Sequence, residues 1–177
     1  LINLAMQTKP FRKQREKVIP QAIGRVLEIG IGSGLNLDFY NISRISEIFA
    51  VEPDSVLLEK AKIKAKLNNI SLNIKRLSAE LLPFDDASFD TVVSTYTMCS
   101  ISELNSVMVE IKRVLKNDGS FIFSEHGKAP DDNIHKWQKR LNPIQKRIGG
   151  GCCLDKDIPK IIINSNFKLQ KINSMYV

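Results

Sequence analysis

Cysteine, aromatic residues and long apolar runs are all scarce in this sequence. Cysteine occurs three times in 177 residues, and the odd count includes the adjacent pair Cys152 and Cys153, a spacing that disfavours a disulfide. Apolar runs such as residues 121–123 and 161–163 are far shorter than the roughly 20 residues that cross a bilayer, and no signal peptide is visible. These features argue against a disulfide-rich secreted scaffold and a membrane-spanning chain. We therefore expect a cytoplasmic protein.

Histidine is rarer still, and its scarcity bears on metal binding. His126 and His135 are the only two histidines, and the sequence has no C-x-x-C pair. Zinc sites usually show such spacings, so the sequence predicts no metal site. Aromatic residues make up 7% of the chain and are not interleaved with lysine and arginine, so nucleic acid is not an expected partner.

Basic residues, by contrast, are abundant and concentrated in two segments. The net charge is +7; residues 1–25 hold six Lys or Arg against one acid, and residues 128–150 hold six against two. The simplest interpretation is two solvated helix faces, because Lys and Arg are normally exposed. The alternative is a surface that attracts an anionic acceptor or an anionic membrane, with peripheral association of the protein.

The length and composition fit a single domain with one core. Short apolar runs alternate with stretches of helical period, which is typical of βαβ units. We predict an α/β fold: a Rossmann-like, doubly wound, mostly parallel sheet with helices on both faces. The chain begins in a helix-like stretch at Leu1 and stops in a strand-like run at Val177, so both ends and a terminal strand are expected to be missing.

Four parts are expected within the single domain 1–177. They are an N-terminal helical cover (1–23), a cofactor-binding core (24–127), a basic acceptor-side insertion (128–154), and the last helix and strand (155–177). Strands are predicted over 24–29, 48–51, 72–77, 89–94, 120–124 and 167–172. Helices are predicted from about 35 to 40, over 55–67, from the N-cap Ser102 to Leu115, and from the N-cap Asp155 to about 164.

The turn after the first predicted strand carries the most informative pattern. Residues 28–34 read Glu-Ile-Gly-Ile-Gly-Ser-Gly, which places Glu28 at the strand end and alternate glycines at Gly30, Gly32 and Gly34. Glycine permits positive φ and lets a ligand approach the backbone. The third glycine of a dinucleotide fingerprint would fall at Leu35, and no P-loop lysine follows, so neither motif fits.

Glu52 ends the second predicted strand, 18 positions after Gly34. An acid about 20 residues beyond a glycine turn is placed to accept hydrogen bonds from both hydroxyls of a ribose. Its charge also disfavours a phosphate at the same place. The turn and the two acids together therefore predict a nucleoside site at the carboxyl ends of the strands.

The E-x-G-x-G-x-G spacing resembles motif I of the class I methyltransferases, which use S-adenosyl-L-methionine and release S-adenosyl-L-homocysteine. Residues 52–54, 78–84 with 88–90, and 114–116 before Gly119 extend the resemblance over most of the chain. It implies methyl transfer to a small-molecule acceptor, with Glu28 facing the amino acid end of the cofactor and Glu52 its ribose. The other implied contacts are Pro53 and Leu81 at the adenine face, Ala79 or Glu80 at the adenine edge, and Thr95 beside the methionine moiety.

A closer similarity is to the methyltransferase-like thiol methyltransferases and their bacterial relatives. It is carried by residues 34–37 (Gly-Leu-Asn-Leu), 98–101 (Met-Cys-Ser-Ile), 125–127 (Glu-His-Gly), and Trp137 followed by 150–154 (Gly-Gly-Cys-Cys-Leu). Two turns depart from the family pattern. Residues 116–119 read Lys-Asn-Asp-Gly in place of Lys-Pro-Gly-Gly, and residues 164–167 lack a glycine, which affects loop geometry more than chemistry.

The acceptor side is less specified. The sulfonium is already an activated methyl donor, so alignment can suffice and a base is dispensable. For a thiol acceptor a base would raise the thiolate fraction, and His126 is the candidate; the alternative is that it satisfies local backbone groups. Glu125 could orient it, although neighbours on a strand point to opposite faces. The three cysteines are interpreted as packing residues rather than as nucleophiles or ligands.

Several functional alternatives stay open. The acceptor could be a thiol, a phospholipid head group or a quinone-like ring, and the rival classes are a catalytically silent cofactor-binding module and a basic RNA-binding domain. Within the basic insertion, an apolar stripe of helical spacing either covers the sheet edge or forms a lid over the acceptor. We expect Pro143 to bend or divide this helix. The stripe consists of Ile134, Trp137, Leu141, Ile144 and Ile148.

Overall fold

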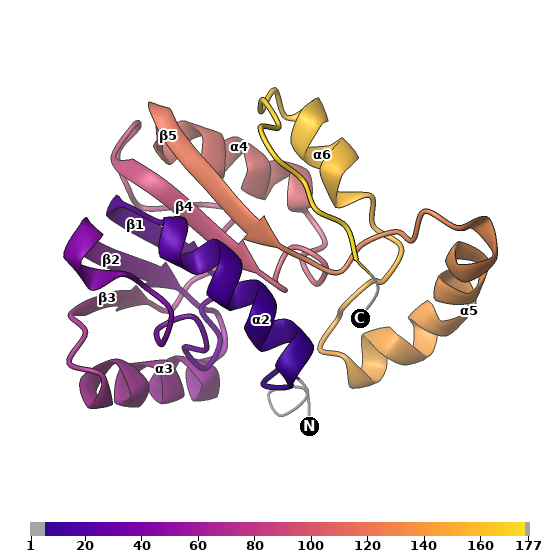
Figure 1. The fold of residues 1–177 in the computed structure, drawn as a ribbon, viewed down its shortest axis with the longest axis horizontal. Coiled ribbons are helices and arrows are strands. Elements are labelled where there is room, and N and C mark those ends of the chain that lie inside the picture. The colour runs from indigo at the N-terminus through magenta and orange to yellow at the C-terminus, as the bar shows by residue number, and fades with distance from the viewer. Residues whose placement is uncertain (1–5, 176–177) are drawn as a thin grey trace.

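The computed structural model describes residues 6–175, so the features expected at Leu1 and Val177 lie outside the described residues. Its centre is a five-stranded, all-parallel sheet with the order β3-β2-β1-β4-β5 (Figure 1). The strand order reverses between β1 and β4, and open α/β sheets bind ligands at the carboxyl ends beside such a reversal. The strands are β1 (Gly24–Ile29), β2 (Ile45–Val51), β3 (Leu72–Lys75), β4 (Phe89–Thr95) and β5 (Leu115–Ser124).

Helices cover both faces of this sheet, as predicted (Figure 1). On one face α3 (Ser55–Leu67) packs Ala61 and Ala65 into a core that includes Val26 of β1. On the other face α4 (Leu104–Val114) and α6 (Ile158–Asn164) share a core with Leu27 and Val92. Successive strand residues point to opposite faces, so the continuous apolar runs of β1 and β4 supply both cores. The predicted α/β, Rossmann-like fold is confirmed.

The N-terminal segment lies against the sheet. The helix α2 (Lys9–Val18) leads into the short 3-10 helix η1 (Ile19–Gln21), and a second one, η2 (Ile42–Arg44), precedes β2. The ring of Phe11 in α2 contacts the rings of Tyr96 and His126, which follow β4 and β5. The first half of α2 therefore covers the carboxyl ends of these two strands.

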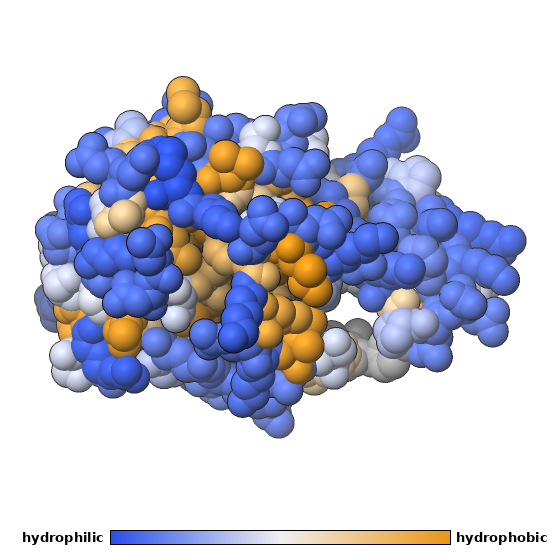
Figure 2. All heavy atoms as spheres, turned by 90° about the horizontal axis from the view of Figure 1, so that it is seen from above, coloured by the Kyte–Doolittle hydropathy of each residue, from blue (hydrophilic) through white to orange (hydrophobic). Residues whose placement is uncertain are grey.

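The helix α5 (Asp132–Ile148) projects from the body of the molecule (Figure 1). Its apolar stripe does not cover the sheet edge, because its five side chains are 42–68% exposed. Seen from above, the arm that carries α5 presents mostly hydrophilic side chains (Figure 2), as expected for an amphipathic helix viewed from its polar side. Pro143 lies inside α5 and does not divide it.

Two predicted elements are wrong. Residues 35–40 form successive turns rather than a helix, with hydrogen bonds such as Leu37 N–H to the Gly34 carbonyl at 3.1 Å. The physical reason is the side chains of Asn36 and Tyr40, which both turn inward to a buried carboxylate. Residues 167–172 form no strand within the described chain; instead Phe167 packs its ring 5.7 Å from that of Phe121.

Several boundaries also differ from the prediction. Glu103 rather than Ser102 is the N-cap of α4, and Asp157 rather than Asp155 caps α6 by accepting from Lys160 N–H at 3.2 Å. β5 begins at Leu115, directly after α4, because the strand extends back to pair with Phe89. These are shifts of position and leave the element order unchanged.

Candidate functional site

The glycine turn after β1 has three residues with positive φ, at Gly30, Gly32 and Gly34. A Cβ at Gly30 would lie 2.3 Å from Thr97 Cγ2, and one at Gly34 would lie 2.8 Å from Leu37 Cδ1. These two glycines therefore allow the turn to pack closely. A Cβ at Gly32 would meet no atom within 4 Å, so this side of the turn is open to a ligand.

Glu52 lies directly against this open side. Its Oε2 accepts a hydrogen bond from Gly32 N–H at 2.8 Å, and its Oε1 accepts one from Asp54 N–H at 3.0 Å. A carboxylate has about four acceptor positions, so two remain for other donors. The structure thus brings Glu52 and the turn together across 20 residues of sequence, and the pair forms an acceptor-rich edge that suits a diol.

Glu28 is fully buried at the end of β1. Its oxygens accept hydrogen bonds from Asn36 Nδ2 at 2.8 Å and from the Tyr40 hydroxyl at 2.7 Å. Burial raises the pKa of Glu28 to about 7, although the bonds from Tyr40 and Asn36 favour the charged form. In this structure Glu28 therefore orders the segment that follows the glycine turn.

The same network reaches Thr95 and the N-terminal helix. Asn36 Nδ2 donates to Thr95 Oγ1 at 3.0 Å, and Arg15 Nε donates to Asn36 Oδ1 at 3.1 Å. Arg15 is buried, and its guanidinium also lies 5.0 Å from the ring centroid of Tyr96. Burial lowers the pKa of Arg15, while the Tyr96 and Glu28 side chains raise it. One hydrogen-bonded network therefore joins α2, β1 and β4 at the carboxyl edge.

The four residues predicted to contact the adenine differ in their exposure to solvent. Pro53 is exposed, and Leu81 is 80% exposed, so both offer apolar surface to a planar ring. Glu80 is half-buried and bonded to the Ser78 hydroxyl. Ala79 is buried in the core beneath α4, so its methyl group does not face solvent.

The helix α4 holds this adenine-side loop in place. Glu110 Oε2 accepts from Leu82 N–H at 2.7 Å, and Arg113 donates to the carbonyls of Leu82 and Phe84 at 2.8 and 2.7 Å.

A surface hollow of about 650 Å³ lies elsewhere, between α3 and the β2–β3 edge, and contains none of the predicted cofactor residues.

Three aromatic rings cluster at the carboxyl ends of β4 and β5. Tyr96 follows β4 with a φ of 55°, a left-handed conformation that is strained for tyrosine. Its ring lies 5.1 Å from the rings of both Phe11 and His126. Sequence reasoning missed Tyr96, although its place directly after the predicted fourth strand was a usable signal.

Glu125 contacts the loop after β4 rather than His126. Its Oε1 accepts from the backbone N–H groups of Thr97 and Met98 at 2.9 and 3.0 Å, and its Oε2 accepts from that of Cys99 at 3.3 Å. Burial raises the pKa of Glu125. The orienting role suggested for Glu125 therefore applies to residues 97–99.

Comparison with known proteins identifies relatives of this chain. The human thiol S-methyltransferase TMT1B is 32% identical over 85% of this chain and 64% of its own length, and human TMT1A is 29% identical over 93% and 69%. The chain thus spans about two thirds of the length of these relatives. The crystal structure of YcgJ from Bacillus subtilis superposes with a TM-score of 0.71 at 24% identity, over 86% of this chain and 65% of that one, which supports the fold. The sequence profile described as "Methyltransferase domain" matches residues 27–123, more than half of the chain, and the protein therefore belongs to the methyltransferase-domain family.

Proposed function

We propose that this chain is the catalytic domain of an S-adenosyl-L-methionine-dependent methyltransferase that acts on a small molecule. The observation that carries the proposal is the Glu52 carboxylate bonded to the open middle glycine of the turn, at 2.8 Å. The remaining acceptor positions of Glu52 would take the ribose hydroxyls. When bound, the cofactor supplies an electrophilic methyl group on a sulfonium.

The protein's own contribution is binding and alignment. Gly30, Gly32 and Gly34 would let the backbone approach the cofactor, while Pro53 and Leu81 would cover the adenine face. Backbone groups of Ala79 and the Glu80 side chain would read the adenine edge. Glu28 and Thr95, joined through Asn36, would fix the surroundings of the amino acid end.

For the acceptor we propose a thiol ahead of a phospholipid head group or a quinone-like ring. Both curated relatives compared above are named thiol S-methyltransferases. His126 is half-buried beside Tyr96 and Phe11, on the side where an acceptor would approach, and we propose that it acts on the acceptor thiol. A side chain there can raise the fraction of reactive thiolate.

A methyl-transfer screen tests this function. The chain is incubated with S-adenosyl-L-methionine and panels of thiols, amines, quinols and dispersed phospholipids, and S-adenosyl-L-homocysteine is measured. The expected result is turnover with at least one thiol. Cofactor binding without turnover on any panel would favour the silent module, and RNA binding without cofactor binding would favour the RNA-binding domain.

We further propose that α5 attaches the domain peripherally to an anionic membrane. None of the described helices is long and apolar enough to cross a membrane, but α5 exposes Trp137 and Ile144 at 60% and 59%. The helix carries five basic residues beside this stripe, which is the composition of an interfacial helix. They are Lys136, Lys139, Arg140, Lys146 and Arg147.

Vesicle co-sedimentation tests this attachment. Binding is expected to vesicles that contain acidic phospholipid and to fall by about tenfold for Trp137→Glu, since charge on the apolar face opposes insertion. The matched control is Ile63→Glu, which alters an equally exposed residue of α3 at 61%. Equal binding to neutral and acidic vesicles would contradict the electrostatic part of the proposal.

A further inference from the structure

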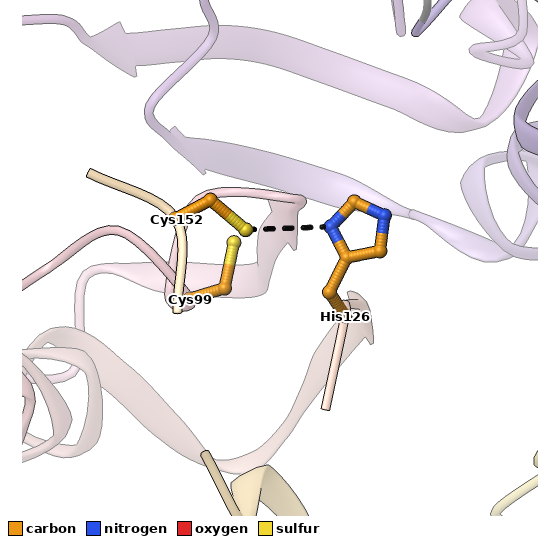
Figure 3. A group of neighbouring side chains, drawn as sticks. All are labelled: Cys99, His126 and Cys152. Carbon is orange, nitrogen blue, oxygen red and sulfur yellow. Dashed lines mark hydrogen bonds between the residues drawn. The ribbon is translucent and has the colours of Figure 1, made fainter. Parts of the chain in front are cut away.

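Three segments that the sequence singled out meet at one point in the fold. Cys99 follows β4, His126 follows β5, and Cys152 lies in the loop between α5 and α6 (Figure 3). Their ligand atoms, two sulfurs and a ring nitrogen, all lie within 4.8 Å of one another. Both cysteines are buried, and all three side chains point toward one another. The sequence predicted no metal site because these residues are 26 or more positions apart.

One pair of ligand atoms at hydrogen-bonding distance has the spacing found in zinc sites, and the third ligand atom lies within 4.8 Å of both. In a tetrahedral site, with Zn–S near 2.3 Å and Zn–N near 2.05 Å, the expected separations are about 3.6 Å between S and N and about 3.8 Å between two sulfurs. Cys152 Sγ lies 3.7 Å from His126 Nδ1. Two thiolates and an imidazole are also the donor set that favours zinc over harder cations. The geometry points to a zinc site formed by Cys99, His126 and Cys152.

The surrounding backbone holds the ligands in place. Cys153 N–H donates to the Cys99 carbonyl at 3.0 Å, which joins the two cysteine loops. Gly151 has a φ of 88°, so glycine lets the chain turn sharply just before Cys152. On the other side, the Glu125 carboxylate accepts the Cys99 N–H at 3.3 Å. These bonds join the loops that carry the ligands and so hold the ligands near one another.

Three protein ligands leave one coordination position free, which is the arrangement of catalytic rather than structural zinc. Binding of the ion converts each cysteine thiol to a thiolate and releases its proton to solvent. This step rests on the proposed thiol acceptor: its sulfur would occupy the fourth position as a thiolate after losing a proton to solvent, so that His126 would act on the acceptor through the metal and not as a base. The cofactor side is close, because Thr97, two residues before Cys99, donates from Oγ1 to the Gly30 carbonyl at 3.2 Å.

The test is metal content and cobalt substitution, neither of which depends on methyl transfer. The purified chain is expected to hold one zinc ion per molecule. After chelation and reloading with Co²⁺, it should show intense thiolate-to-cobalt charge-transfer absorption. Cys152→Ser should weaken metal affinity by more than about a hundredfold, since losing a ligand costs more than the roughly 10- to 100-fold of changing a group that only orients a ligand. The matched control is Cys153→Ser, which should retain the ion, since the Cys153 thiol points instead to the Gly151 carbonyl at 3.6 Å.

Other outcomes overturn the site. They are a chain that takes up no zinc under reducing conditions, equal metal affinity of the Cys152→Ser and Cys153→Ser chains, or a stable Cys99–Cys152 disulfide in place of the ion. If Cys152→Ser does not fold, the cobalt spectrum of the unchanged chain tests the site: thiolate-to-cobalt absorption supports it, and the lack of that absorption overturns it. Adding 2-mercaptoethanol to the cobalt form should shift that spectrum if the fourth position is open to a thiol. If the cobalt spectrum forms but does not shift with the thiol, the proposal that the acceptor binds the metal is wrong, and the metal site itself remains supported.

Discussion

At the residue scale, Glu28 shows how a single buried acid can organise a site. The residue is 1% exposed, and its carboxylate accepts hydrogen bonds from Asn36 and Tyr40, which lie 8 and 12 positions further along the chain. An isolated carboxylate in such a place would be costly, so the two donors compensate part of the cost of burial. The segment after the glycine turn therefore bends inward toward Glu28.

The raised pKa of Glu28 has a consequence for stability. Its pKa rises from an ordinary value of 4.5 to about 7, so the folded chain binds more protons than the unfolded chain between these two values. The contribution of this group is fully present below about 4.5 and is lost as the pH rises through about 7. At about 1.4 kcal/mol per unit, the difference is on the order of 3 kcal/mol.

Glu28→Gln should therefore flatten the pH dependence of the unfolding free energy. We expect urea titrations at several pH values from about 5 to about 8 to show a smaller decline for the variant than for the unchanged chain. Glu59→Gln, an exposed acid paired with Lys62, serves as the control and should leave the slope unchanged. Identical slopes for all three proteins would show that Glu28 titrates at its ordinary pKa.

At the element scale, the glycines of the turn lie in two different surroundings. Gly30 and Gly34 fit where a Cβ would collide with Thr97 and Leu37, whereas Gly32 faces open space. The three glycines look equivalent in the sequence, but in the structure two of them are needed for close packing and one faces open space.

Alanine substitutions distinguish the effect of the turn on stability from its proposed effect on cofactor binding. Gly32→Ala should cost about 1–2 kcal/mol of stability, because alanine disfavours a positive φ, and should weaken cofactor binding by about tenfold or more. Gly30→Ala adds the clash with Thr97 and should lower the melting temperature further. Thermal unfolding with and without S-adenosyl-L-methionine measures both effects. A Gly32→Ala chain with unaltered cofactor stabilisation would show that the open side of the turn is not the binding surface.

The sequence predicted the elements that local pattern determines. β1 and α3 match their predicted bounds, because an apolar run and an apolar face respectively define them. Residues 35–40 and 167–172 were wrong for a different reason. The first segment depends on distant hydrogen-bond partners, and the second needs a neighbouring strand, which does not form within residues 6–175.

The site was predictable to the extent that it follows strand ends. Glu52 and the glycine turn do lie together, and Tyr96 could have been found from its place directly after β4. Arg15 was missed because tertiary packing alone brings α2 to the carboxyl edge. The cysteine–histidine cluster was missed for the same reason, since its three members lie on separate loops. Contacts across the chain leave no periodic signal in a single sequence.

At the scale of the whole molecule, the two proposed sites lie at the same edge of the sheet but follow different strands. The glycine turn and Glu52, the proposed cofactor site, lie at the ends of β1 and β2. The cluster of Cys99, His126 and Cys152 lies beyond β4 and β5, and the His126 ring contacts Phe11 of α2. A donor and an acceptor held at these two places would meet at the carboxyl edge between β1 and β4, where alignment can lower the barrier.

Calorimetric titration with S-adenosyl-L-methionine tests the central claim most directly. The unchanged chain should bind one cofactor per molecule, and Glu52→Gln should bind roughly 10- to 100-fold more weakly, because hydrogen bonds to a charged group contribute about 1.5–3 kcal/mol. Glu59→Gln, on the exposed face of α3, should bind as the unchanged chain does. An unchanged chain without measurable affinity, or a Glu52→Gln chain with full affinity, would contradict the assignment of this turn as the cofactor site.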